Sequence, residues 1–145
     1  VVGIMVTVVQ GGLVGKVVSK FGQYKAVLIG YFFWTLGLIL FGLASEGWMM
    51  YSFIVFYCLG GVASPTLQGI ISNEVPNNAQ GELQGVLVSV NALAMILSPL
   101  VMTGMFAAFT RPDAAIYFPG APFLLSMVLI AIGVTVFIRA RPAER

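Results

Sequence analysis

The sequence predicts an all-α membrane protein that crosses the bilayer five times. Of its 145 residues, 59% are hydrophobic and 8% are charged, whereas soluble domains contain roughly a quarter of charged residues. Its mean hydropathy is +1.01, and its apolar runs each approach the ~20 residues that a helix needs to cross the hydrocarbon layer. The polar stretches between these runs are short, so we expect no soluble domain.

Short polar breaks divide the chain into five hydrophobic runs. Phe21-Gly22-Gln23, Ser45-Glu46-Gly47 and the stretches 72–80 and 110–120 carry the Gly, Pro, Asn and Ser residues typical of turns. The predicted spans are about 1–18, 25–44, 48–71, 81–109 and 121–139. Because residue 1 lies inside an apolar run, we expect the chain to be a C-terminal fragment of a longer protein.

The basic residues indicate an orientation in the membrane. With five alternating spans, Arg111 falls on one side and all other basic residues fall on the opposite side: Lys16, Lys20, Lys25, Arg139, Arg141 and Arg145. Lys and Arg gather in cytoplasmic loops, so we expect a multi-pass protein with a cytoplasmic C-terminus. The net charge of +2 and the lack of a basic stripe argue against a nucleic-acid partner.

Polar residues recur at helical spacing in three of the five spans. Gln84, Asn91 and Ser98 repeat every seven residues in the fourth span. The third span carries Tyr57, Gly61, Ser64 and Gln68, and the first carries Gly3, Thr7 and Gln10. Polar groups that face lipid are costly, so these three helices are predicted to line a polar cavity. The candidate pathway residues are Gln10, Tyr57, Ser64, Gln68, Gln84 and Asn91.

The other two spans have no such stripe. The second carries only Tyr31, Trp34 and Thr35 as side chains with polar groups, so we expect it to face mostly lipid. Small residues elsewhere allow helices to approach closely, and prolines produce kinks. The packing and gating candidates are Gly11, Gly15, Gly22, Gly61, Pro65, Gly69, Gly81, Gly85 and Pro99.

The sequence offers little for catalysis or metal binding. It contains no His, and no acidic residue lies deeper in a predicted span than Glu82, at the start of the fourth, so neither a metal site nor a base for Ser64, Ser89 or Ser98 is available there. We therefore expect no enzyme activity, no metal and no cofactor. Cys58 lies in an apolar run and is predicted to be a small core residue.

Two segments resemble a known family. The run 60–69, Gly-Gly-Val-Ala-Ser-Pro-Thr-Leu-Gln-Gly, and the run 81–89, Gly-Glu-Leu-Gln-Gly-Val-Leu-Val-Ser, resemble helices ten and eleven of the tetracycline-resistance group of major facilitator superfamily transporters. The loop Gly15–Gly22 resembles that superfamily's cytoplasmic Gly-x-x-x-Asp-Arg-x-Gly motif, with Ser19 in place of Asp. The resemblance implies that the spans are helices eight to twelve, most of the C-terminal six-helix bundle.

The resemblance also implies a function. It implies a proton-coupled exporter of a small amphipathic molecule or drug in a bacterial inner membrane, with lipid, substrate, protons and a missing N-terminal half as partners. Helix ten would line the central cavity, helices eight and eleven would face the other half, and helices nine and twelve would lie outside. Gln10 matches a glutamine of tetracycline exporters, whereas Trp34 stands where they carry an aspartate. The alternatives are a carrier of a sugar or metabolite, and a non-transporting scaffold.

Overall fold

The computed structural model describes residues 2–112 and 116–140. Throughout these ranges the regular structure is helical, and no strand occurs in them. The elements in chain order are α1 (Val2–Val8), the π turn η1 (Val9–Leu13), α2 (Val14–Phe21), α3 (Gln23–Leu43), α4 (Gly47–Leu59), the 3-10 turn η2 (Gly60–Val62), α5 (Ala63–Asn73), the 3-10 turn η3 (Asn77–Ala79), α6 (Gln80–Thr110) and α7 (Ala121–Arg139).

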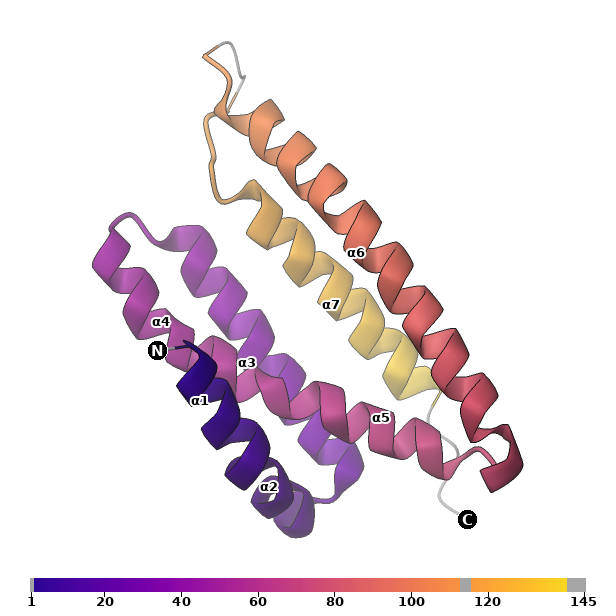
Figure 1. The fold of residues 1–145 in the computed structure, drawn as a ribbon. Coiled ribbons are helices and arrows are strands. Elements are labelled where there is room, and N and C mark those ends of the chain that lie inside the picture. Colours follow the sequence, from indigo (N-terminus) through magenta and orange to yellow (C-terminus); the bar gives the residue numbers. More distant parts are fainter. Residues whose placement is uncertain (1, 113–115, 141–145) are drawn as a thin grey trace.

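These elements form five helical rods, because α1, η1 and α2 run on as one rod and α4, η2 and α5 as another (Figure 1). Four stretches are long and apolar enough to cross a bilayer: Gln23–Leu43, Gly47–Asn73, Asn77–Thr110 and Ala121–Arg139. The predicted all-α membrane fold is confirmed. The predicted boundaries of the spans stay a prediction, because helix ends do not define the membrane surface.

Helix α3 is the central element of the described chain. It packs against α2, α4, α5 and α7, and the side chains of Ala26 and Val27 have no exposed surface. The expectation that this span faces mostly lipid is therefore wrong. Its apolar residues do not follow a stripe because they meet neighbours on several sides, while Phe32 remains 64% exposed.

Glycines let α3 come close to the α4–α5 rod. A Cβ atom added to Gly30 would lie 2.6 Å from the backbone nitrogen of Ala63, and one added to Gly37 would lie 3.0 Å from Cα of Tyr57. Real Cβ atoms essentially never approach other atoms below 3.0 Å. The two rods therefore cross almost at backbone contact, as small residues permit in membrane bundles.

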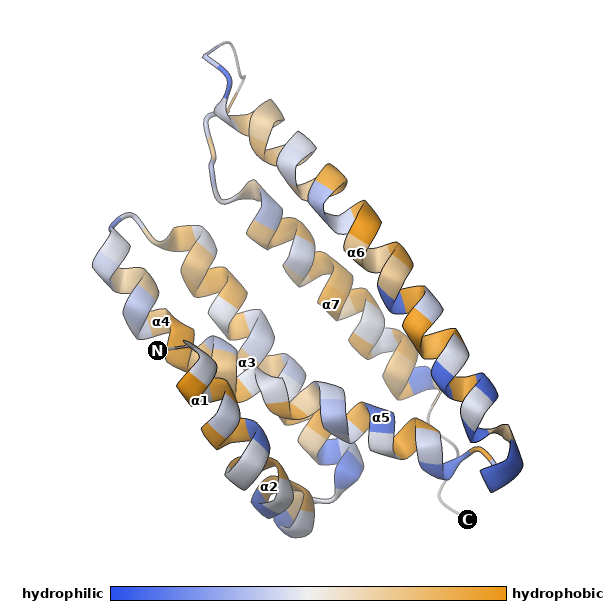
Figure 2. Cartoon of the chain, viewed as in Figure 1, coloured by the Kyte–Doolittle hydropathy of each residue, from blue (hydrophilic) through white to orange (hydrophobic). Residues whose placement is uncertain are grey.

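Helix α6 is the most exposed element. None of its residues is buried, and of the other long helices it packs mainly against α7, which runs beside it (Figure 1). Figure 2 shows apolar residues along much of α6 and α7, with hydrophilic residues gathered at the corner between α5 and α6. The other sides of α6 lie uncovered by the described chain.

The connections alternate between the two ends of the bundle. The α2–α3 turn, the α5–α6 corner and the end of α7 lie at the lower end in Figure 1. Within the described ranges, this end carries Lys16, Lys20, Lys25 and Arg139, whereas Arg111 lies at the other. We call the lower end the basic end.

Candidate functional site

The predicted polar stripes lie on faces that the described chain leaves uncovered. Gln10, Ser64, Gln68, Gln84 and Asn91 are all exposed. They come from three rods, which are α1–η1–α2, α4–η2–α5 and α6. The candidate site is therefore a set of three open polar faces, and not an enclosed pocket within this chain.

Gln10 lies in the π turn of the first rod. The turn spans Val9–Leu13, and π turns inside helices frequently mark functional sites. Val9 is buried in a cluster with Ala26 and Val62, which fixes this turn against its neighbours. Gln10, the next residue, is exposed, so the anchored turn presents its amide away from the core.

A 3-10 turn divides the predicted stripe of the second rod. Pro65 has no N–H to donate to the carbonyl of Gly61, and the helix tightens just before it, where the N–H of Ala63 donates to the carbonyl oxygen of Gly60. A 3-10 turn advances about 120° per residue against about 100° in an α-helix, so three residues rotate the following helix by roughly 60°. Residues on either side of the turn therefore do not share one strict face.

Tyr57 lies in α4, before this turn, and contacts α3. Its ring centroid lies 6.3 Å from that of Trp34 and 5.8 Å from that of Phe41, both on α3. Ser64 and Gln68, beyond the turn, remain exposed. Tyr57 therefore contacts α3 and is itself 39% exposed, and its place in the polar pathway stays a prediction.

The polar face of α6 carries Gln84, Asn91 and Ser98, all exposed. The side-chain amide of Asn91 donates to the carbonyl oxygen of Leu87 at 2.8 Å. Pro99 lies inside the helix, and the hydroxyl of Thr103 donates to its carbonyl oxygen at 2.5 Å. A continuous helix thus carries this face, and the backbone of the same helix holds the amide of Asn91.

The hydrogen bonds of the stripes are local. Asn91, Ser89 and Thr7 each donate to the carbonyl four residues earlier. Within the described residues, no hydrogen bond joins the amide of Gln10, Gln68 or Gln84 to another helix. The stripes therefore do not hold these helices to one another.

The predicted glycine contacts have no partner in the described chain. A Cβ built on Gly11, Gly15, Gly69, Gly81 or Gly85 meets nothing within 4 Å, and one on Gly61 meets only Val9, at 4.0 Å. Their packing role stays a prediction. The close contacts at Gly30, Gly37, Gly60 and Gly120 were not predicted, although the seven-residue spacing of Gly30 and Gly37 was a usable signal.

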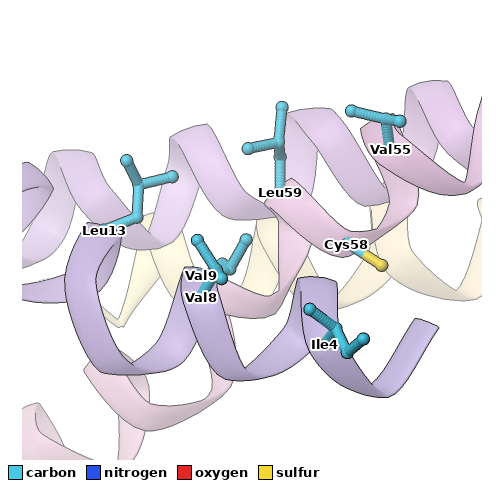
Figure 3. Close-up of a pocket in the computed structure, with 7 residues that line it drawn as sticks. All are labelled: Ile4, Val8, Val9, Leu13, Val55, Cys58 and Leu59. Carbon is cyan, nitrogen blue, oxygen red and sulfur yellow. The ribbon is translucent and has the colours of Figure 1, made fainter. Parts of the chain in front are cut away.

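One cavity lies between the first rod and α4 (Figure 3) and has a volume of about 350 Å³. Every side chain that lines it is apolar apart from the thiol of Cys58. Cys58 is 3% exposed, as predicted for a core residue. None of the candidate polar residues lines this cavity. Elsewhere in the described ranges, no three His, Cys, Asp or Glu side chains come together.

Comparison with known protein families shows to which family this chain belongs. The sequence profile of the Major Facilitator Superfamily matches residues 2–145. The chain belongs to the Major Facilitator Superfamily. As a member of this superfamily, it has the all-α membrane fold that the two motif segments and the hydrophobic runs predicted.

Several curated relatives of this chain are tetracycline resistance proteins. The chain is 33% identical to the class C tetracycline resistance protein of Escherichia coli over 74% of its length, and 28% identical to the class B protein of Escherichia coli over 90%. It is 27% identical to mouse Hippocampus abundant transcript-like protein 1 over 94%. The matches cover 27%, 33% and 30% of these relatives. No solved structure matches. The expected resemblance to the tetracycline-resistance group of this superfamily is confirmed.

Proposed function

We propose that the chain is part of a secondary transporter that exports small amphipathic molecules in exchange for protons across a bacterial inner membrane. Its superfamily membership and its similarity to tetracycline resistance proteins support this proposal. The basic end, with Lys16, Lys20 and Lys25, supports a cytoplasmic position for the α2–α3 turn and the C-terminus.

The exposed polar faces are the observation that carries the proposal. Amides in apolar helices are costly unless they find hydrogen-bonding partners. Gln10, Gln68 and Gln84 have none on neighbouring described helices. A water-filled path between two transporter halves would satisfy them, and neutral amides would offer hydrogen bonds to a passing substrate.

Proton coupling needs a titratable carboxylate, and the apolar cores of the described helices contain none. The described acidic residues, Glu46, Glu74 and Glu82, lie at or next to helix ends. A proton-carrying carboxylate at membrane depth would therefore come from the missing half that the superfamily resemblance implies. Liposomes that contain residues 1–145 alone are expected to show no proton-coupled flux. Measurable flux would show that the proton-carrying group lies within these residues.

The decisive experiment uses a full-length transporter that includes this chain and compares Gln68→Leu and Gln84→Leu with Gln23→Leu, which lies at the first turn of α3. At unchanged expression, the first two variants are expected to abolish export of amphipathic drugs, tetracycline included, and the third to preserve it. If Gln68→Leu and Gln84→Leu keep full export and only melt at a lower temperature, the residues act as a scaffold. Uptake assays with labelled sugars test the alternative of a metabolite carrier.

A further inference from the structure

We propose that a cavity at the basic end binds an organic cation that carries an apolar body. The cavity lies between α3, α5 and α7 and has a volume of about 630 Å³. Pockets for small molecules measure about 300–1,000 Å³, so the cavity is large enough for such a ligand. This site goes beyond the proposed function, because transport through the polar faces does not require it.

Apolar side chains form most of the wall. Leu67 and Ile70 contribute from α5, and Val136 contributes from α7. Burial of an apolar ligand surface against such walls contributes about 25 cal/mol per Å². The cavity offers few hydrogen-bonding groups, which disfavours a sugar or another highly polar solute.

Aromatic rings give the cavity a preference for positive charge. Tyr24 of α3 and Phe137 of α7 both line it, and their ring centroids lie 5.6 Å apart. Tyr31, two helical turns beyond Tyr24, adds a third ring. The negative faces of such rings attract ammonium and other organic cations, and sites of this kind recognise quaternary ammonium groups.

Glu74 adds the complementary charge. It follows directly after α5 and is the one acidic or basic residue among the described residues that line the cavity. No Lys or Arg of the described chain forms an ion pair with it. Arg139 is exposed and lies outside the lining. A carboxylate beside three rings and apolar walls suits a hydrophobic cation and repels an anion of the same shape.

The site is separate from the candidate transport path. Gln10, Ser64, Gln68, Gln84 and Asn91 do not line it. The glycine at position 133 is part of its wall, and a Cβ built there meets nothing within 4 Å. A larger side chain at residue 133 would therefore occupy the cavity without displacing the helices around it.

The test uses two probes of matched shape and opposite charge, tetraphenylphosphonium and tetraphenylborate. Equilibrium dialysis measures their binding to the purified protein in an uncharged detergent, with protein-free micelles as the blank. We expect one saturable site for tetraphenylphosphonium and none for tetraphenylborate. Equal binding of both probes, or no binding of the cation, overturns the proposal.

Two variants locate the bound cation. Glu74→Gln removes the charge and is expected to weaken binding at least tenfold, whereas Glu82→Gln, a carboxylate outside this cavity, leaves it unchanged. Gly133→Leu keeps the carboxylate and fills the cavity, so it is expected to abolish binding. Gly104→Leu, which also meets open space, is its control. Undiminished binding to folded Gly133→Leu protein overturns the site.

The cation could be a free solute or the ammonium group of a membrane lipid. Nanodiscs of phosphatidylglycerol alone and of its mixture with phosphatidylethanolamine distinguish these sources. The measured quantity is the part of tetraphenylphosphonium binding that Glu74→Gln removes. If phosphatidylethanolamine lowers this Glu74-dependent binding, the lipid headgroup occupies the site. If phosphatidylethanolamine leaves the binding unchanged, the ligand is a free cation.

Discussion

The indole ring of Trp34 lies so close to Gly60 that any side chain at residue 60 would overlap it. The same ring lies 6.0 Å from that of Tyr31 and 6.3 Å from that of Tyr57, measured between centroids. By the resemblance to tetracycline exporters, Trp34 is expected to stand where they carry an aspartate. Here the residue at this position packs between α3 and the α4–α5 rod, and the 3-10 turn that contains Gly60 makes room for it.

Gly60→Ala is therefore expected to destabilise the fold. The added methyl group overlaps the indole, and overpacking of this kind costs about 1–3 kcal/mol. Thermal melting in detergent measures the loss. Gly61→Ala is the matched control, because its Cβ would meet only Val9, at 4.0 Å. Equal melting temperatures for the two variants would show that the ring moves aside without cost.

Gln80 closes the corner between α5 and α6. Its Nε2 donates to the carbonyl oxygens of Ser72 at 2.8 Å and Val75 at 2.9 Å, and its Oε1 accepts from the hydroxyl of Ser72 at 2.9 Å. Gln80→Leu is expected to cost about 0.5–1.5 kcal/mol for each hydrogen bond lost, because the partly buried groups of Ser72 and Val75 lose their partner. Hydrogen exchange of the amides at 74–79 should become faster, whereas Asn78→Ala, an exposed residue of the same corner, should leave it unchanged. Unaltered exchange in Gln80→Leu would contradict the bracing role.

Hydrophobic runs and turn residues predicted the helical membrane fold, because both act locally along the chain. The central position of α3 was not predictable in the same way. Its contacts depend on glycines such as Gly30 and Gly37, which leave no polar stripe in the sequence and gain their meaning only from the helix packed against them. The register of the third-span stripe was also not predictable in detail, since a constant helical period does not include the extra rotation of the 3-10 turn Gly60–Val62.

Gly22 sits in a backbone conformation that suits glycine alone. Its φ of 80° and ψ of 162° fall in a region that is essentially closed to residues with a Cβ atom. Gly22→Ala is expected to destabilise the α2–α3 turn by about 1–3 kcal/mol, measured as a lower melting temperature. A melting temperature equal to that of the unaltered protein would show that the turn relaxes into another conformation.

Gly15→Ala provides the comparison for Gly22 and tests a packing prediction. Gly15 lies inside α2 and a Cβ there meets nothing within 4 Å. Ala exceeds Gly in helix stability by about 0.5–1 kcal/mol, so this change is expected to be neutral or stabilising in residues 1–145 alone. If the same change lowers the stability of a longer protein that includes this chain, Gly15 packs there against a further element, as the sequence predicted.

We expect the open polar face of α6 to be in contact with water. Asn91 lies on this face, whereas Leu93 points to another side of the same helix and is 60% exposed in the described chain. Successive helical residues turn by about 100°, so the two side chains differ by roughly 200° in direction.

In a Cys58→Ala background, Asn91→Cys should react quickly with a membrane-impermeant maleimide, because water fills the path beside it. Leu93→Cys should react slowly, because its thiol stays protonated and dry in lipid. Similar rates at both positions would mean that α6 has no separate water-lined face, and the proposed path would have to lie elsewhere.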